Sequence, residues 1–160
     1  MENQLLDEGI LDQPTEQETL EYASGGKRFG NFLIDIILAY LFVIVGIVII
    51  ALLVPSSALL VADGGFISYL IIYSGIFLYF FMSEFFMKGR TIGKLITGTR
   101  AITVEGEYLS AGTAAARSLA RFVPFEAFSF LGQHSSGWHD RWTSTMVVNE
   151  SDFRERQKTF

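Results

Sequence analysis

The chain has 160 residues, of which 50% are hydrophobic and 18% are charged, and it contains no cysteine. The apolar residues gather in two long blocks, which is typical of a membrane protein and not of a soluble core. The absence of cysteine excludes a disulfide framework, thiol chemistry and a cysteine-based metal site. The net charge of −5 arises mostly in the first two dozen residues, and the remainder of the chain is close to balanced.

The first 24 residues are acidic, with seven Asp and Glu residues and no Lys or Arg. We interpret residues 1–24 as an acidic, solvated N-terminal tail, and the alternative is a docking segment for a basic partner. We expect no cleavable signal peptide, because the acidic segment comes first and the apolar block that follows is too long.

The first apolar block carries no charge from Ile36 to Val54. A helix from Phe32 to Val54 would be about 35 Å long, enough to cross a bilayer core of about 30 Å. Pro55 ends this block, and the second runs from Phe66 to about Met87 and is rich in aromatic residues. The sequence therefore predicts membrane spans at about 32–54 and 66–87.

Lys and Arg residues flank the start of the first predicted span and the end of the second, and the linker 56–65 has none. Because positive residues favour the cytoplasmic side, we expect both termini to be cytoplasmic and the linker to lie outside. The predicted fold class is an all-α membrane protein built on an antiparallel transmembrane helical hairpin, which the short linker favours.

The rest of the membrane domain, assigned to residues 25–149, contains two short alternating runs at Thr99–Val104 and Thr143–Val148. We predict that these runs pair as strands. Between them, residues 111–131 cannot cross a bilayer without burying charge at Arg121 and Glu126.

We therefore expect residues 111–131 to be an amphipathic or re-entrant helix on the cytoplasmic side, with a distorted third span as the alternative. Residues 150–160 are expected to be a charged, mobile C-terminal tail. Within the hairpin, depth counting places Gly46 level with Tyr73, and we predict that Gly46 makes room for this aromatic ring.

Few residue patterns point to catalysis or to a cofactor. The segment Gly89–Leu95 resembles a phosphate loop, but its glycine spacing is one residue short and Leu95 stands where Ser or Thr is needed. His134 and His139 are five residues apart, which does not suit a metal site on one helix face. We expect no enzyme activity, no cofactor, no bound metal, and no nucleotide or nucleic-acid partner.

Two acids lie inside the predicted spans, Asp35 and Glu84, each about three residues from the cytoplasmic end. An acid within a span is costly and requires partners. We predict a polar cluster on the cytoplasmic side in which Asp140 meets Arg28 and Asp35 faces the same cluster. Possible further members of the cluster are Glu84, Lys94 and Arg141.

Three short motifs give the chain a family resemblance. They are Lys27-Arg28-Phe29 with Leu33-Ile34-Asp35, then Gly89–Lys94 followed by Thr99–Ile102, and finally Gly137–Arg141 before Thr145–Val148. In this order around two spans, they resemble the RDD family of small integral membrane proteins, which is named for one arginine and two aspartates. The resemblance covers about residues 22–149 and implies that the family positions are Arg28, Asp35 and Asp140.

The resemblance implies a multi-spanning domain for which transport of ions or small ligands has been suggested. Two spans cannot enclose a pathway, so cation-linked or proton-linked transport would need an oligomer or a partner. The first hypothesis is therefore a non-catalytic membrane subunit or scaffold with a structural charge cluster, and transport is the alternative. The expected location is the cell membrane, as a multi-pass protein of a bacterial inner membrane. The expected partners are the lipid bilayer and either a second copy or another membrane protein.

Overall fold

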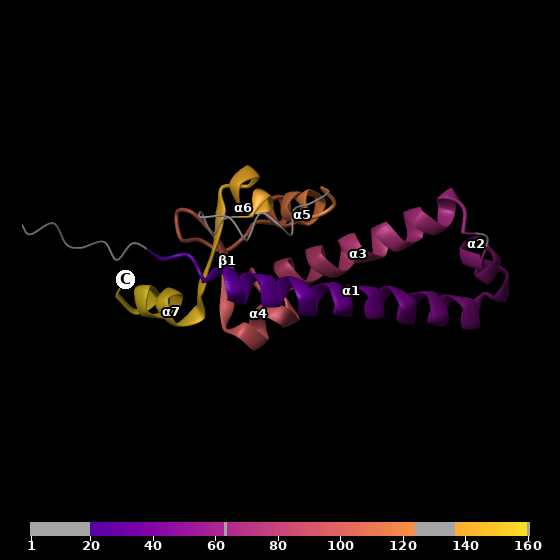
Figure 1. Cartoon of the computed structure of the whole chain (residues 1–160), viewed down its shortest axis with the longest axis horizontal. Coiled ribbons are helices and arrows are strands. Elements are labelled where there is room, and N and C mark those ends of the chain that lie inside the picture. Colours follow the sequence, from indigo (N-terminus) through magenta and orange to yellow (C-terminus); the bar gives the residue numbers. More distant parts are fainter. Residues whose placement is uncertain (1–19, 63, 124–136, 160) are drawn as a thin grey trace, which may run out of the picture.

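A computed structural model of the chain describes residues 20–62, 64–123 and 137–159. The chain is mostly helical, and two long helices extend away from an end where a small sheet and most of the shorter helices gather (Figure 1). In chain order the elements are α1 (Gly25–Leu53), the 3-10 helix η1 (Pro55–Ser57), α2 (Ala58–Ala62), α3 (Phe66–Phe86), α4 (Ile92–Thr97), β1 (Thr99–Thr103), α5 (Ala111–Ala120), α6 (Trp138–Trp142), β2 (Thr145–Asn149) and α7 (Glu150–Thr159).

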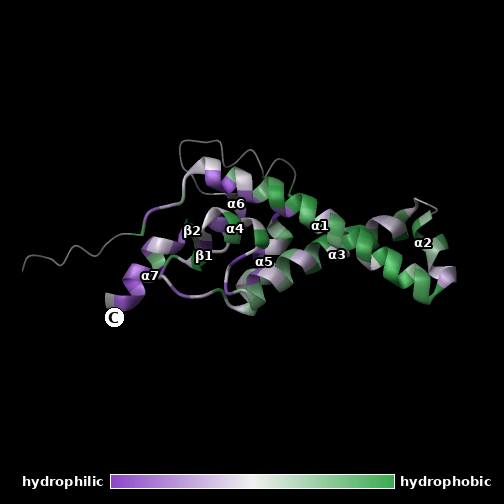
Figure 2. Ribbon diagram, turned by 90° about the horizontal axis from the view of Figure 1, so that it is seen from below, coloured by the Kyte–Doolittle hydropathy of each residue, from purple (hydrophilic) through white to green (hydrophobic). Residues whose placement is uncertain are grey.

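Helices α1 and α3 are long and apolar enough to cross a membrane, with 29 and 21 residues. Most of their apolar side chains are exposed, as Ile37 (67%) and Leu52 (77%) illustrate. In Figure 2, much of the ribbon of both helices has the colour of hydrophobic residues, whereas α7 is mostly hydrophilic. The two helices agree with the predicted spans, except that α1 begins at Gly25, well before the apolar block.

One face of α1 is buried, and its residues recur every four positions: Asn31, Asp35, Ala39 and Val43. The apolar half of this face packs against Ile76, Tyr79 and Phe80 of α3. At Gly75 the two helices approach closely, because a Cβ atom there would lie 2.7 Å from Cγ2 of Val43. The polar half of the same face, Asn31 and Asp35, lies nearer the start of α1 and forms hydrogen bonds with polar groups of other elements.

The prediction that Gly46 makes room for Tyr73 is wrong. A Cβ atom on Gly46 would meet nothing within 4 Å. Tyr73 is 54% exposed, and its ring contacts Phe122 edge-on, with 5.6 Å between the ring centroids. Counting residues from the helix ends predicts depth but not the rotation of each helix about its axis, so the small residue at the contact is Gly75 instead.

The predicted strand pair is confirmed. β1 and β2 form an antiparallel two-stranded sheet whose register joins Thr99 to Asn149 and Thr103 to Thr145. The segment before α1 extends this sheet, since the amide of Ala23 donates to the carbonyl of Val147 over 2.8 Å. Residues 20–23 of the expected N-terminal tail are therefore ordered against the sheet, and residues 1–19 lie outside the described part of the chain.

Residues 150–159 form helix α7, so the prediction of a mobile C-terminal tail is wrong for them. Phe153 is buried in a cluster with Ile102, Met146 and Val148 on one face of the sheet. One aromatic residue and the ion pairs of Glu150 with Arg100 (2.8 Å) and Arg90 (3.5 Å) thus hold this short charged segment.

Helix α5 covers the first half of the segment expected at 111–131. The side chain of Ser110 caps it by accepting from the amide of Thr113 over 3.1 Å, and the helix ends at Ala120. Residues 124–131, the second part of this predicted segment, lie outside the described residues.

Candidate functional site

Charged side chains from five helices meet where α1 begins and α3 ends. Glu84, near the end of α3, is fully buried and accepts hydrogen bonds from three cations. Its Oε1 atom receives Nζ of Lys94 (2.7 Å) and Nη2 of Arg121 (2.8 Å). Its Oε2 atom receives Nε of Arg117 over 2.9 Å. Arg117 and Arg121 are four residues apart, so the spacing of α5 directs both guanidinium groups to one carboxylate.

The second acid of the network is Asp140, in the first turn of α6, which is also fully buried. It accepts from Arg28 of α1, and its Oδ1 atom receives Nη1 of Arg117 over 2.5 Å. Arg117 also donates to the hydroxyl of Thr145 on β2. Arg117 therefore bridges both acids. We call Arg28, Glu84, Lys94, Arg117, Arg121 and Asp140 the charge network.

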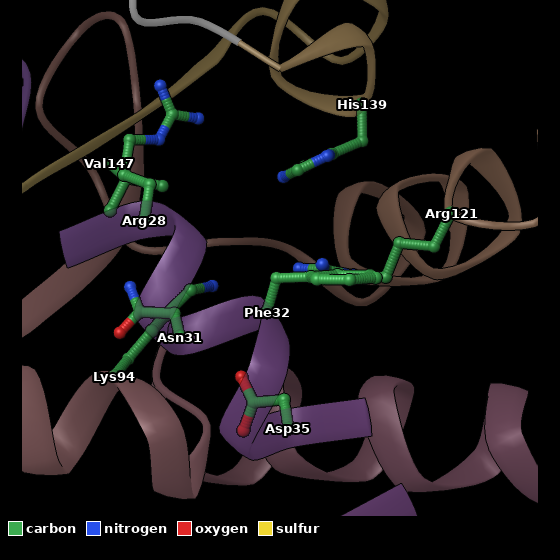
Figure 3. Close-up of a pocket in the computed structure, with 8 residues that line it drawn as sticks. All are labelled: Arg28, Asn31, Phe32, Asp35, Lys94, Arg121, His139 and Val147. Atoms are coloured by element: carbon green, nitrogen blue, oxygen red, sulfur yellow. The ribbon is translucent and has the colours of Figure 1, made fainter. Parts of the chain in front are cut away.

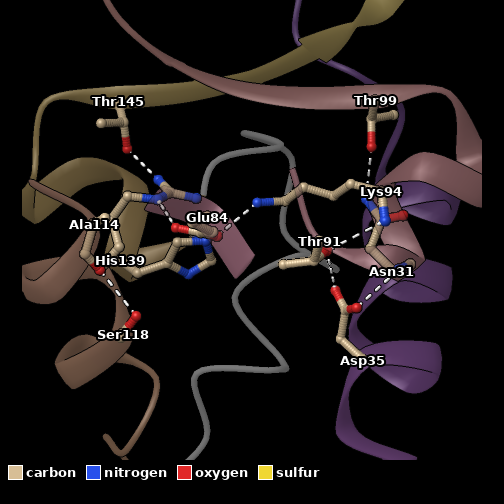
Figure 4. A network of polar contacts seen from close by, with 12 residues as sticks. Asn31, Asp35, Glu84, Thr91, Lys94, Thr99, Ala114, Ser118, His139 and Thr145 are labelled. Carbon is tan, nitrogen blue, oxygen red and sulfur yellow. Dashed lines mark hydrogen bonds and ion pairs between the residues drawn. The ribbon is translucent and has the colours of Figure 1, made fainter. Parts of the chain in front are cut away.

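Asp35 has a separate set of partners on the buried face of α1. Its Oδ2 atom accepts from the hydroxyl of Thr91 (2.5 Å), and Oδ1 accepts from the amide of Gly93 (2.8 Å) and the hydroxyl of Tyr79 (3.3 Å). A side chain at position 93 would force a shift, because a Cβ atom would lie 2.8 Å from the carbonyl oxygen of Asn31 and 2.9 Å from Oδ1 of Asp35. The carboxylate thereby fixes the start of α4 against α1 (Figure 4).

A small cavity lies between Asp35 and the charge network. Its volume is about 20 Å³, enough for about one water molecule. Figure 3 shows His139 extending toward it from α6, opposite the α1 residues. The residues that line it are Arg28, Asn31, Phe32, Asp35, Lys94, Arg121, His139 and Val147.

The environment of the cavity lowers the pKa values of Lys94 and His139. Burial, opposed by the nearby carboxylate of Glu84, lowers the pKa of Lys94 to about 8. Burial and the positive charges of Arg121 and Arg117 hold the pKa of His139 well below its usual range. The described residues contain no group of three His, Asp or Glu side chains placed to hold a metal ion.

The structure brings together some of the residues singled out from the sequence and separates others. Arg28 contacts Asp140, and Lys94 contacts Glu84. Asp35 borders the same cavity but takes its described hydrogen bonds from Thr91, Gly93 and Tyr79. Arg141 is exposed on the surface of α6.

The sequence reasoning missed Arg117 as the residue that joins the two acids. A signal was present in the sequence, because the i,i+4 spacing of Arg117 and Arg121 places both side chains on one helix face. The predicted amphipathic helix at 111–131 suits an arginine pair at the membrane interface, whereas in the structure both arginines bind Glu84 of α3.

Two long apolar helices, closed at one end by a buried charge network, indicate a small, mostly helical membrane protein. The chain belongs to the RDD family, because the model of this family matches residues 22–144. The resemblance carried by the sequence motifs is thus confirmed, and Arg28, Asp35 and Asp140 all fall inside the matched range. Helix α7 lies outside it. Comparison with curated proteins and with solved structures found no match.

Proposed function

We propose that this protein is a non-catalytic membrane subunit or scaffold. In this proposal α1 and α3 form an antiparallel transmembrane hairpin, and the charge network joins the hairpin to a cytoplasmic cap made of the sheet, α4, α5, α6 and α7. The observation that carries the proposal is that both network acids are held by donors from other elements. Glu84 on α3 binds α4 and α5, and Asp140 on α6 binds α1 and α5.

Such an arrangement suits a structural role. An acid that carries an ion must exchange partners, whereas Glu84 is held by three cations at 2.7–2.9 Å. A buried ion pair contributes little net stability compared with an apolar pair, but removal of one partner is costly because it leaves an uncompensated buried charge. The network therefore specifies one relative placement of hairpin and cap.

The charge distribution supports a cytoplasmic location for the cap. Lys27 precedes the apolar part of α1, and Lys88 and Arg90 follow α3, all at the end of the molecule that holds the network. The linker 56–65 at the other end has no Lys or Arg. By the positive-inside rule, the proposed location is the cell membrane, multi-pass, with both termini cytoplasmic and a bacterial inner membrane as the expected compartment.

Transport of a cation or proton is the second candidate, and one observation favours it. Asp35 is a buried acid on an apolar helix, and it borders a cavity of about 20 Å³ lined by several ionisable side chains. A pathway across the membrane would require a second copy or another membrane protein, because a single hairpin cannot enclose one.

Reconstitution into liposomes separates the two candidates. A scaffold is expected to give no Na⁺ or H⁺ flux above that of empty vesicles under an imposed pH or Na⁺ gradient. Flux by the unmodified protein that disappears in Asp35→Asn, with the protein still folded, would contradict the scaffold and support transport. Asn keeps an oxygen for the amide of Gly93, so this variant is a conservative one.

A further inference from the structure

Helix α4 has its polar and apolar faces in the opposite arrangement to that of a soluble protein. Gly93 and Lys94 are buried against the rest of the chain. The large apolar residues point outward: Ile92 is 41%, Leu95 46% and Ile96 66% exposed. These three occupy positions i, i+3 and i+4, so they share one face. A helix in water places such a face inward, and the reverse is expected where the surroundings are apolar.

The position of α4 along α1 places this face at a specific depth. At about 1.5 Å per residue, the 29 residues of α1 extend about 44 Å, and the bilayer core is about 30 Å thick. If one edge of the bilayer core lies at the C-terminal end of α1, about nine residues at the N-terminal start of α1 lie outside the core. A Cβ atom at Gly93 would contact Asn31 and Asp35, so α4 crosses α1 at this boundary.

Two features beside α4 also suit a membrane surface. In the turn of α1 that α4 contacts, Leu33 and Ile37 are exposed, which continues the apolar surface of the long helix to the level of α4. Lys88, between α3 and α4, is exposed as well, and its charge suits the anionic headgroups of a cytoplasmic leaflet.

We propose that Ile92, Leu95 and Ile96 form a lipid-binding face, which lies in the cytoplasmic leaflet where acyl chains meet headgroups. The proposal rests on the transmembrane hairpin proposed above. The internal face of α4 is fixed by the hydrogen bonds of Thr91 and Gly93 to Asp35 and by the ion pair of Lys94 with Glu84. One short helix therefore connects the lipid surface to Asp35 and Glu84.

Single nitroxide labels test this placement, and the absence of native cysteine means that each variant carries one label only. The variants are Ile96→Cys, with Ile44→Cys in the middle of α1 and Val104→Cys beyond β1 as controls. All three positions are exposed aliphatic residues. The full chain is reconstituted into vesicles of phosphatidylethanolamine and phosphatidylglycerol. Collision rates are measured with molecular oxygen, which enters acyl chains, and with a neutral nickel chelate, which stays in water.

We expect the ratio of oxygen to nickel collisions at position 96 to fall between a high value at 44 and a low value at 104. A ratio at 96 equal to that at 104, with 44 still high, would overturn the lipid-binding face alone. Protection of position 96 from both reagents would also overturn it, because the face would then be covered by protein. A low ratio at position 44 would overturn the proposed hairpin itself.

Discussion

Removal of Arg117 tests whether the charge network holds the hairpin to the cap. Arg117 is fully buried and donates to Glu84, Asp140 and Thr145, so Arg117→Ala breaks contacts with three elements at once. Hydrogen bonds to charged groups contribute about 1.5–3 kcal/mol each. Part of this loss is offset, since Glu84 keeps Lys94 and Arg121 and Asp140 keeps Arg28.

The expected loss for Arg117→Ala is therefore about 3–5 kcal/mol in the free energy of unfolding, the range for a buried pair that loses one partner. The assay is reversible unfolding in mixed detergent and SDS micelles, followed by circular dichroism. Arg154→Ala is the matched control. Its side chain is 65% exposed, and it forms only an i,i+4 pair with Glu150 among the described contacts, with an expected loss under about 0.5 kcal/mol.

A double-mutant cycle sharpens the test. Because Arg117 and Glu84 are in direct contact, Arg117→Ala combined with Glu84→Gln should lose less than the sum of the single losses, by about 0.5–3 kcal/mol. If Arg117→Ala proves no more destabilising than Arg154→Ala, the network does not hold the two parts together, and the structural reasoning behind the scaffold proposal fails.

Three further predictions concern packing, pH and topology. Gly93→Ala should destabilise the protein by about 1–3 kcal/mol in the same unfolding assay because its Cβ would press on the carbonyl oxygen of Asn31 and on Asp35, whereas Gly46→Ala, in open space within α1, should be neutral or stabilising by up to about 1 kcal/mol; equal changes would contradict the contact. Hydrogen bonds from Arg100 lower the pKa of Glu150 to about 2, so the stabilisation of α7 is complete above the usual pKa near 4.5 and is lost as pH falls toward 2; a nitroxide at Ser151→Cys should become more mobile over this range, and a pH-independent signal would refute the role of the pair. A cysteine at Ser57 should react with an impermeant thiol reagent in intact cells while one at Ser24 should not, and the reverse pattern would overturn the proposed topology.

The parts of the fold that follow from composition and local pattern were predictable. Two uncharged apolar blocks specify two long helices, and alternation near residues 100 and 146 specified the strand pair. Helix α7 was not predictable in this way, because its composition is that of a solvated segment and its attachment depends on one buried residue, Phe153. Propensity and periodicity carry no information about a single long-range anchor.

Part of the candidate site was likewise predictable from the sequence, and part of it was not. The positions of Arg28 and Asp140 came from the family resemblance, since 112 residues separate them and no spacing rule links them. Glu84 could be found because an acid in an apolar helix needs partners. Its partners could not all be named, because which face of α5 turns toward α3 is decided by tertiary packing. The separate hydrogen bonds of Asp35 likewise depend on a close approach at Gly93 that the sequence pattern does not indicate.

The sheet has a consequence for the order in which the protein is completed during synthesis. Its second strand is also the strand that binds the segment before α1, through Ala23 and Val147. Asp140, the described partner of Arg28, precedes that strand by only a few residues. Arg28 and the two proposed transmembrane helices are therefore translated before Asp140, with which Arg28 forms its described ion pair. The contact between α1 and α6 can form only after both long helices have been synthesised, so the charge network is completed after the two helices that it joins to the rest of the chain.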